Sequence, residues 1–242
     1  MRAPDRRSLL SGLASLPLAG GLFAPPALAA VSEAEARKAR SIARLKAEGV
    51  PFIDWLPMIE DSSQARPPGA DAVARRFCAL MLMTHKALAD DAAATRTVRE
   101  AFGDRVVFSP DELTFMDAAA PGQQEVVQAS WLCEAAVPMA WALGRLDRLD
   151  RPEKAVDVDV LAALIMDDDG KALIAGARLR PIGEILDEAD LIFRYHWAVR
   201  QAGLDGKEAP AGLNADVVPE RHRGLNWLIG YAADWDEVTT DT

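Results

Sequence analysis

The chain has 242 residues, of which 50% are hydrophobic, and its 37 acidic side chains against 27 basic ones give a formal net charge of −10. This apolar fraction predicts a globular protein with enough material for one good core or two small ones. The negative charge argues against a phosphate backbone or an anionic membrane surface as partner, so we expect no nucleic acid to bind.

The first 29 residues are typical of an export signal. Arg6 and Arg7 precede a weakly apolar run over residues 9–23, and Ala27 and Ala29 supply the small side chains that a signal peptidase recognises. The paired arginines match the twin-arginine pattern of bacteria. We therefore expect this segment to engage the export machinery of the twin-arginine route and to leave a periplasmic protein after cleavage.

Two alternatives to that interpretation stay open. An ordinary secretory signal can carry two arginines by chance, and an uncleaved segment would act as an anchor. A membrane-spanning helix needs about 20 predominantly apolar residues, and glycines and prolines at positions 20, 21, 25 and 26 cut the apolar run short. We expect no membrane span in the exported part of the chain.

Residues 30–66 are predicted to form an N-terminal helix followed by an extended link. The helix covers residues 32–48, is rich in Ala, Glu, Lys and Arg, and ends at Gly49. The stretch 52–59 is predicted to be extended because a proline interrupts it, and residues 64–69 form a proline-rich connection.

Residues 67–242 are predicted to form a compact helical domain. Its expected helices cover residues 71–90, a shorter stretch to 102, and then 110–119, 123–149, 160–166, 171–179, 181–203 and 219–231. Ser109 and Glu112 predict a capping box, and Pro138 predicts a kink or break near residue 137. Only residues 105–108 suggest a short strand. The predicted fold class is all-α, with at most one short β-pair.

The sequence contains none of the common catalytic motifs. It has no phosphate-binding glycine loop, no dinucleotide fingerprint, no His-Glu-x-x-His pair and no Gly-x-Ser-x-Gly elbow. The acidic run 167–170 resembles part of a calcium loop, but Ile165 and Gly176 would occupy its first and twelfth positions, where side-chain oxygens are required. We interpret the run as a solvated acidic turn.

Cys78 and Cys133 are the only cysteines in the sequence, and both lie in apolar, helix-like stretches. The simpler interpretation is two buried free thiols. The alternative is a disulfide formed after export, which would stabilise the fold by roughly 4 kcal/mol in the chain-entropy model. Their number and separation do not suggest a zinc site or a redox pair.

The predicted helix 181–203 carries charges among apolar residues. At about 100° per residue, Asp187, Asp190, Arg194 and Trp197 fall within one stripe, and Asp190 lies one turn before Arg194. A buried ion pair persists only when its hydrogen bonds are well made. The structural interpretation is therefore an internal salt-bridge network.

A second charged cluster begins at Glu220. Glu220 shares a helical face with Trp227, while His222 and Asn226 lie one turn apart on another face. If this helix packs on the preceding one, His196 and His222 could converge with the nearby carboxylates, which are the raw material of a metal or acid–base site. The alternative is a set of core histidines satisfied by hydrogen bonds, and the sequence identifies no cofactor.

Trp131, Glu134 and Trp141 can lie along one side of the predicted helix 123–149. In the structural interpretation Glu134 accepts a hydrogen bond from Arg194 or from an indole N–H. In the functional alternative it faces a substrate, such as a carbohydrate, in an aromatic-walled cleft that raises its pKa.

Several short motifs occur together in a specific order. They are Trp-Leu-Cys-Glu at 131–134, Ala-Trp-Ala-Leu at 140–143, Ile-Leu-Asp-Glu-Ala-Asp at 185–190 running into Arg194, His196 and Trp197, Glu-Arg-His at 220–222 before Leu-Asn-Trp at 225–227, Trp-Asp-Glu-Val at 235–238 and Asp-Thr at 241–242. With these motifs the chain, from about residue 37, resembles the bacterial DUF4272 family, a domain of unknown function. The resemblance implies a mostly helical domain without an assigned activity. An export signal departs from what is common in that family.

Two functional hypotheses follow. The preferred one is an exported, non-catalytic helical module that binds an unknown protein or small-molecule ligand, with binding candidates Trp131, Trp141, Arg194, Trp197, Asn226 and Trp227. The alternative is an exported hydrolase with an acid–base or metal-assisted site, with candidates Glu134, Asp187, Asp190, His196, Glu220 and His222, of which His196 and His222 are the candidate metal ligands. The enzyme requires these groups to face a shared, solvent-reachable cavity, whereas the module allows them to be paired and sealed.

Overall fold

A computed structural model describes residues 31–89 and 91–242 of the chain. The predicted export signal, with Arg6, Arg7, Ala27 and Ala29, lies outside the described residues. Val31–Thr242 forms one compact unit. The described part of this unit contains nine α-helices and no β-strand, which confirms the predicted all-α fold class.

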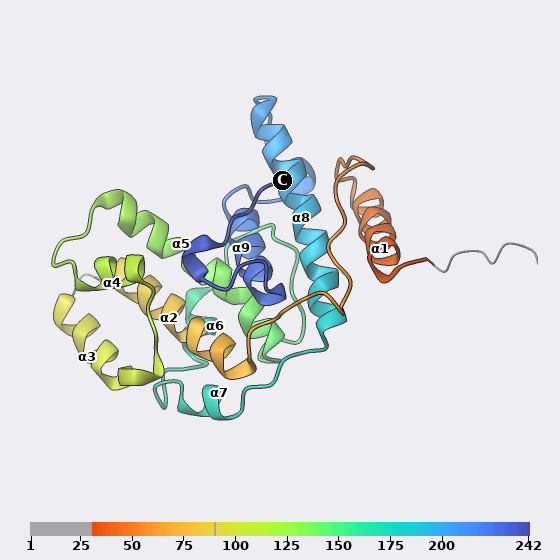
Figure 1. The fold of residues 1–242 in the computed structure, drawn as a ribbon. Helices are drawn as coiled ribbons and strands as arrows, with labels where there is room; N and C mark the ends of the chain where they lie inside the picture. The colour runs from red at the N-terminus through yellow and green to blue at the C-terminus, as the bar shows by residue number, and fades with distance from the viewer. Residues whose placement is uncertain (1–30, 90) are drawn as a thin grey trace, which may run out of the picture. The chain divides into compact units, whose positions relative to one another are not determined.

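The described helices follow one another along the chain as coloured in Figure 1. They are α1 Glu33–Glu48, α2 Ala70–Leu88, α3 Ala92–Phe102, α4 Pro110–Asp117, α5 Gln123–Ala142, α6 Val158–Ala162, α7 Lys171–Ala175, α8 Ile182–Leu204 and α9 Val217–Ile229, with short 3-10 turns η1 Gly103–Arg105, η2 Pro210–Gly212 and η3 Trp235–Glu237. None of these helices combines the length and the apolar character that a membrane span requires.

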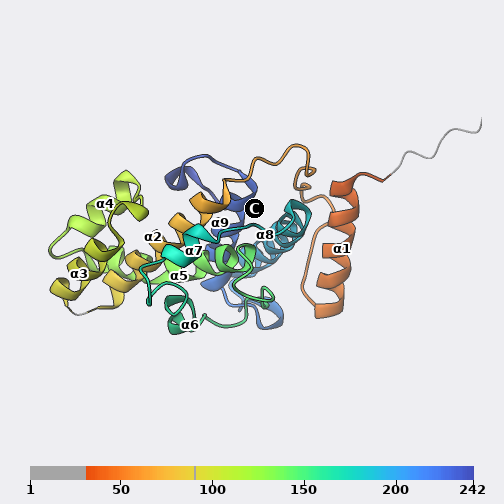
Figure 2. The same cartoon turned by 90° about the horizontal axis from the view of Figure 1, so that it is seen from below.

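The core forms where α2, α5, α9 and α8 pack in succession. α2 lies along α5, α9 packs on α5, and α8 packs on α9. Helix α1 packs on α8 and lies at one end of this row, while α3 and α4 lie beyond the other end in both views (Figures 1 and 2). Phe77 of α2, Met139 of α5 and Leu225 of α9 are fully buried. The central helices are apolar on several sides because each has a helix on more than one face.

Helices α5 and α9 cross at very short range because Gly224 of α9 lacks a side chain. A Cβ atom at this position would lie 2.3 Å from the carbonyl oxygen of Ala135 and 2.7 Å from Cγ of Pro138. Helix α5 runs through Pro138 without interruption, so of the predicted kink or break near residue 137 the break is wrong. The missing Gly224 side chain leaves room for the proline ring, which packs into the crossing.

The helix ends follow local sequence signals where such signals exist. Ser109 and Glu112 form the predicted capping box of α4, with the Ser109 Oγ accepting from the Glu112 N–H at 3.2 Å. Helix α5 ends before the predicted residue 149 because Gly144 turns the backbone into the left-handed region, at φ 70°. The predicted strand at 105–108 is wrong. Its Arg105 carbonyl accepts from the Arg75 side chain instead of from a neighbouring strand.

Both cysteines are buried and free, so the disulfide alternative is wrong. The Cys78 sulfur packs against Gly170, where an added Cβ would lie 2.8 Å from it, and the Cys133 thiol donates to the Ser130 carbonyl at 3.3 Å. Burial raises the pKa of each thiol to about 12. Both thiols are therefore protonated and behave as apolar core groups.

Candidate functional site

Asp190 and Arg194 form a sealed ion pair within α8. The Nε and Nη2 atoms of Arg194 donate to the two carboxylate oxygens of Asp190 at 2.8 and 2.7 Å, and the side chains are 0% and 1% exposed. Nη2 also donates to the carbonyl of Pro57 at 3.2 Å. The predicted internal salt bridge is present, and it ties α8 to the segment that follows α1.

Glu134 of α5 is paired with a residue that the sequence did not suggest. One carboxylate oxygen accepts from Nε of Arg221 in α9 at 2.9 Å, and the other accepts from the backbone N–H of Val156 at 2.5 Å. The predicted partner, Arg194 or an indole, is wrong because α9 rather than α8 packs on this side of α5. Glu134 is 0% exposed, so its carboxylate does not reach a cleft.

His196 of α8 and His222 of α9 meet edge to face in the core. Their Nδ1 atoms lie 2.8 Å apart, and their ring planes are 82° apart. One neutral imidazole must donate and the other accept. Burial lowers the pKa of His196 to about 4, with Arg200 adding to the effect, and lowers the pKa of His222 to about 3. The two rings are therefore uncharged near neutral pH.

The predicted convergence of carboxylates on these histidines is wrong. Asp187 turns instead to α1, where its carboxylate contacts Arg40 at 2.5 Å and Arg37 at 3.3 Å. No group of three or more metal-binding side chains occurs in the part of the chain that the structure describes. The two histidines alone are too few for a structural zinc site, which takes four ligands.

The predicted binding residues also pack inside the fold. Trp141 is buried beneath the guanidinium of Arg180, at 5.2 Å from the ring, and the Asn226 side chain donates to the Thr239 carbonyl at 2.8 Å. Trp227 stacks edge to face against Trp235 with ring centres 6.1 Å apart. Trp131 and Trp197 are half-buried, and neither lines the cleft that is described next.

A cleft of about 530 Å³ opens between α2, α4, α5, α9 and η3. Among the described residues, five carboxyl side chains line it, whereas Arg223 is the only basic one that does. The five are Asp111, Glu112, Glu125, Glu220 and Asp236. Of the six residues predicted for an enzyme site, only Glu220 lines this cavity. We call it the acidic cleft.

Three of these carboxylates are fixed by neighbours, Glu125 by the N–H at the start of its own helix at 2.7 Å. Glu112 accepts two hydrogen bonds from Nη1 of Arg76, at 2.6 and 2.7 Å, and one from the Ser109 N–H at 2.8 Å. Asp236 accepts from the Ser109 hydroxyl at 2.8 Å, which joins η3 to the start of α4. These bonds hold the wall of the acidic cleft in place, while Asp111 stays exposed to solvent.

Glu220 and Arg223 lie one turn apart on α9 without forming a hydrogen-bonded pair. One Glu220 oxygen and the Nε of Arg223 are buried and have no hydrogen-bond partner in the part of the chain that the structure describes. The Arg223 guanidinium instead lies over the ring of Trp235, 4.4 Å from its centre. Burial raises the pKa of Glu220, and the nearby Arg223 offsets only part of that rise. Burial also lowers the pKa of Arg223.

The sequence matches the profile of a known family, described as Domain of unknown function (DUF4272), over residues 37–238. The chain belongs to the DUF4272 family. The match covers every residue that lines the acidic cleft. A search of curated proteins and a search of solved structures found no match. The evidence for a site in this DUF4272 chain is therefore the geometry of its own residues.

Sequence reasoning missed most of the cleft. Glu112 was expected only as a helix cap, and Trp235 and Asp236 were noticed only as part of the closing family motif. The cleft joins positions from α4 to η3 that are separated by more than a hundred residues, so no local spacing marks it. The clearest available signal was the Trp-Asp-Glu-Val motif, which places an indole beside two carboxylates.

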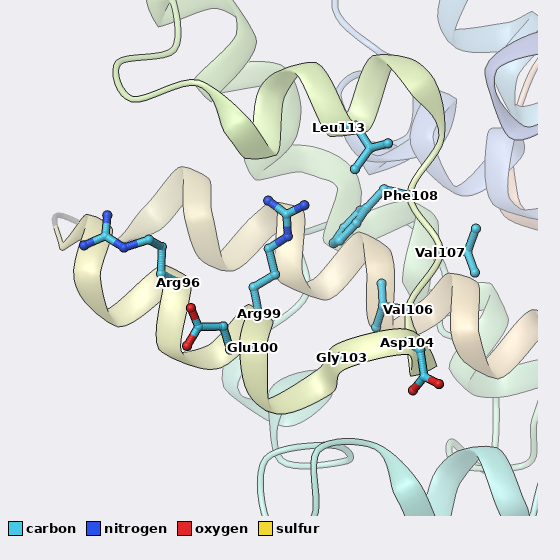
Figure 3. Close-up of a pocket in the computed structure, with 9 residues that line it drawn as sticks. All are labelled: Arg96, Arg99, Glu100, Gly103, Asp104, Val106, Val107, Phe108 and Leu113. Carbon is cyan, nitrogen blue, oxygen red and sulfur yellow. The ribbon is translucent and has the colours of Figure 1, made fainter.

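A second cavity of this DUF4272 chain, of about 680 Å³, lies beside α3 (Figure 3). Arg99 extends toward Phe108, and its guanidinium lies 5.5 Å from that ring and 2.6 Å from the Asp117 carboxylate. Arg96 and Glu100 lie along the same helix, away from Phe108. Because Arg99 is already paired and no predicted site residue lines this cavity, the acidic cleft is the better candidate site.

Proposed function

We propose that this DUF4272 protein is an exported helical binding module and that its acidic cleft holds a cationic ligand. The charge imbalance of the cleft supports the ligand class: Arg76 pairs with Glu112, and the other four lining carboxyl groups share one lining guanidinium, that of Arg223. Carboxylates that line a concave site raise the local concentration of cations. A cavity of about 530 Å³ is within the size range of small-ligand sites. The periplasmic location is proposed from Arg6, Arg7, Ala27 and Ala29.

The contacts of Arg223 support the same ligand class. Its guanidinium stacks on Trp235 and donates to the Trp235 carbonyl at 3.3 Å, so its charge is held at the wall and does not neutralise Glu220 through an ion pair. A bound amine or guanidinium would supply the missing positive charge. Because a nearby cation favours the ionised carboxylate, ligand binding is expected to lower the pKa of Glu220 and to release protons.

Calorimetric titration with spermidine tests the proposal. The double variant Asp111→Asn, Glu125→Gln removes two cleft charges, and each loss should weaken binding several-fold through the Coulomb term near a protein surface. The matched control Glu208→Gln removes one exposed charge outside the cleft. Spermidine affinity should fall about tenfold or more in the double variant and with rising salt, and should stay unchanged in the control. Equal affinities in all three proteins would refute the proposal.

A hydrolase is the second candidate because Glu220 faces the cleft with a raised pKa, as a general acid requires. Carbohydrate stacking has less support: Trp235 is 2% exposed and lies beneath Arg223, so its ring offers no free face. The variant Glu220→Gln, assayed with chromogenic glycosides, distinguishes the candidates. Loss of measurable turnover in this variant would favour the hydrolase, and no turnover in either protein would favour the binding module.

A further inference from the structure

The segment between α1 and α2 exposes an unusual amount of apolar surface. Eight of the nine residues from 51 to 59 are apolar, and Asp54 carries the only charge. Only Leu56 among them is buried, at 4% exposure, whereas Trp55 is 78% and Met58 is 48% exposed. Contiguous exposed apolar surface of this kind marks an interaction site more often than chance. We call residues 51–59 the apolar strap.

Basic side chains on both sides hold the backbone of the apolar strap. Lys38 of α1 donates to the carbonyls of Asp54 and Leu56, and Arg37 of α1 donates to the carbonyl of Ile59 at 3.3 Å. Arg194 of α8 donates to the Pro57 carbonyl at 3.2 Å. The strap runs between α1 and α8 (Figure 1). Its backbone is thus fixed before any partner arrives, which reduces the entropy cost of binding.

The net charge of the region around the strap indicates which partner could bind there. Residues 31–60, which include α1 and the strap, carry five basic and five acidic side chains, so their net charge is zero. Residues 1–30 carry a net charge of +2, which leaves −12 on residues 61–242 out of the total of −10. Residues 61–242 of two copies therefore repel each other, whereas α1 with the strap is neutral and adds no net repulsion.

We infer that the apolar strap docks against the strap of a second copy of this chain, in a two-fold symmetric dimer with Trp55 at its centre. A two-fold interface uses the same patch on both subunits, so a neutral patch with charges of both signs can complement itself. Tryptophan is the side chain most often found at the energetic centre of an interface. The strap, whose backbone is held by α1 and α8, leaves this indole 78% exposed.

Analytical ultracentrifugation tests the inference, with the protein purified from the cells that make it and not truncated further. The wild-type protein should be a dimer at about 100 μM, a concentration that populates dimers of micromolar affinity. Trp55→Ser should raise the dimer dissociation constant by on the order of 100-fold or more, because the change occurs twice in the interface. Met58→Lys should act in the same direction. The control Leu204→Ser removes a side chain of similar exposure, 76%, outside the strap and should leave the dimer intact.

Two results would overturn the inference. One is a wild-type protein that stays monomeric at that concentration. The occupant of the strap would then be a different partner or another segment of the same chain, and not a second copy. The other is a dimer whose dissociation constant is the same in Trp55→Ser and in wild type. Neither result depends on the acidic cleft, and circular dichroism of each variant checks that it is folded.

Discussion

Replacing Asp190 by Asn gives the sharpest test of how the buried charges stabilise this fold. The change removes the carboxylate that binds Arg194 through two hydrogen bonds of 2.8 and 2.7 Å. Arg194 is 1% exposed, and among the described residues the only other acceptor for its guanidinium is the Pro57 carbonyl at 3.2 Å. Its Nη1 atom has no hydrogen-bond partner in residues 31–89 and 91–242. The substitution therefore leaves a buried guanidinium without a counter-charge.

Breaking a buried ion pair by removing one partner costs about 3–5 kcal/mol. Since a domain of this kind has a total stability of roughly 5–15 kcal/mol, Asp190→Asn should lower the urea midpoint by a large fraction of its wild-type value. Urea unfolding followed by tryptophan fluorescence measures the change. The control is Asp150→Asn at the Arg148–Asp150 pair, whose side chains are 83% and 70% exposed and which should cost less than about 1 kcal/mol.

The double variant Asp190→Leu, Arg194→Met separates desolvation from packing. Replacing both members of a buried pair with apolar residues is often close to neutral, because neither charge then has to leave water. The double variant should therefore be more stable than Asp190→Asn alone. A loss below about 0.5 kcal/mol in Asp190→Asn would show that water reaches the pair and would refute the reasoning.

Three further predictions concern the core. Gly224→Ala should lower the free energy of unfolding by about 2–3 kcal/mol, because the added methyl group meets a backbone carbonyl of α5. Thermal unfolding of the variant measures this loss, and an unchanged midpoint would contradict it. The folded pKa values of His196 and His222, about 4 and about 3, lie below the ordinary value of 6.5, so the unfolded chain binds protons first. Their contribution to stability is complete above pH 6.5 and is lost as the pH falls from there toward 4; melting temperatures across this range should decrease, and less steeply in His196→Gln, His222→Gln. Cys78 and Cys133 should resist a thiol reagent at pH 8 in the native protein and react fully in guanidinium, since burial keeps both protonated; rapid native labelling would disprove this.

Most helices of this fold could be predicted because their signals are local. The capping box of Ser109 and Glu112 and the glycine after α1 each act within one turn of the chain. The predictions were wrong where a contact with a distant part of the chain determines the course or the end of a helix. Pro138 did not break α5 because the proline packs against Gly224, 86 positions further along. The long helix predicted to residue 149 ends at Ala142, and Arg180 binds the carbonyls of Trp141 and Leu146 around that end.

The contrast between local signals and distant contacts also explains which parts of the candidate site could be predicted. The pairing of Asp190 with Arg194 could be predicted because both lie on one helix, one turn apart. The partner of Glu134 could not, since Arg221 reaches it only through the packing of α9 on α5. The acidic cleft was not predicted for a related reason. Its wall comes from five elements, and only their packing brings Glu220 and Trp235 into the same cavity.

Four consecutive residues of α9 show why a cluster of charges in a sequence need not be one site. Successive side chains on a helix point about 100° apart, so neighbours face different surroundings. Arg221 binds Glu134 of α5 and His222 contacts His196 of α8, while Arg223 stacks on Trp235 of η3. Glu220 lines the cleft beside Arg223, and of the four it alone brings a carboxyl group to it. Because its three neighbours fasten α9 to three different elements, the position of the Glu220 carboxyl is set by contacts that never touch a ligand. A change in any of them should therefore act on the cleft through stability and position, whereas a change at Glu220 acts on its charge directly.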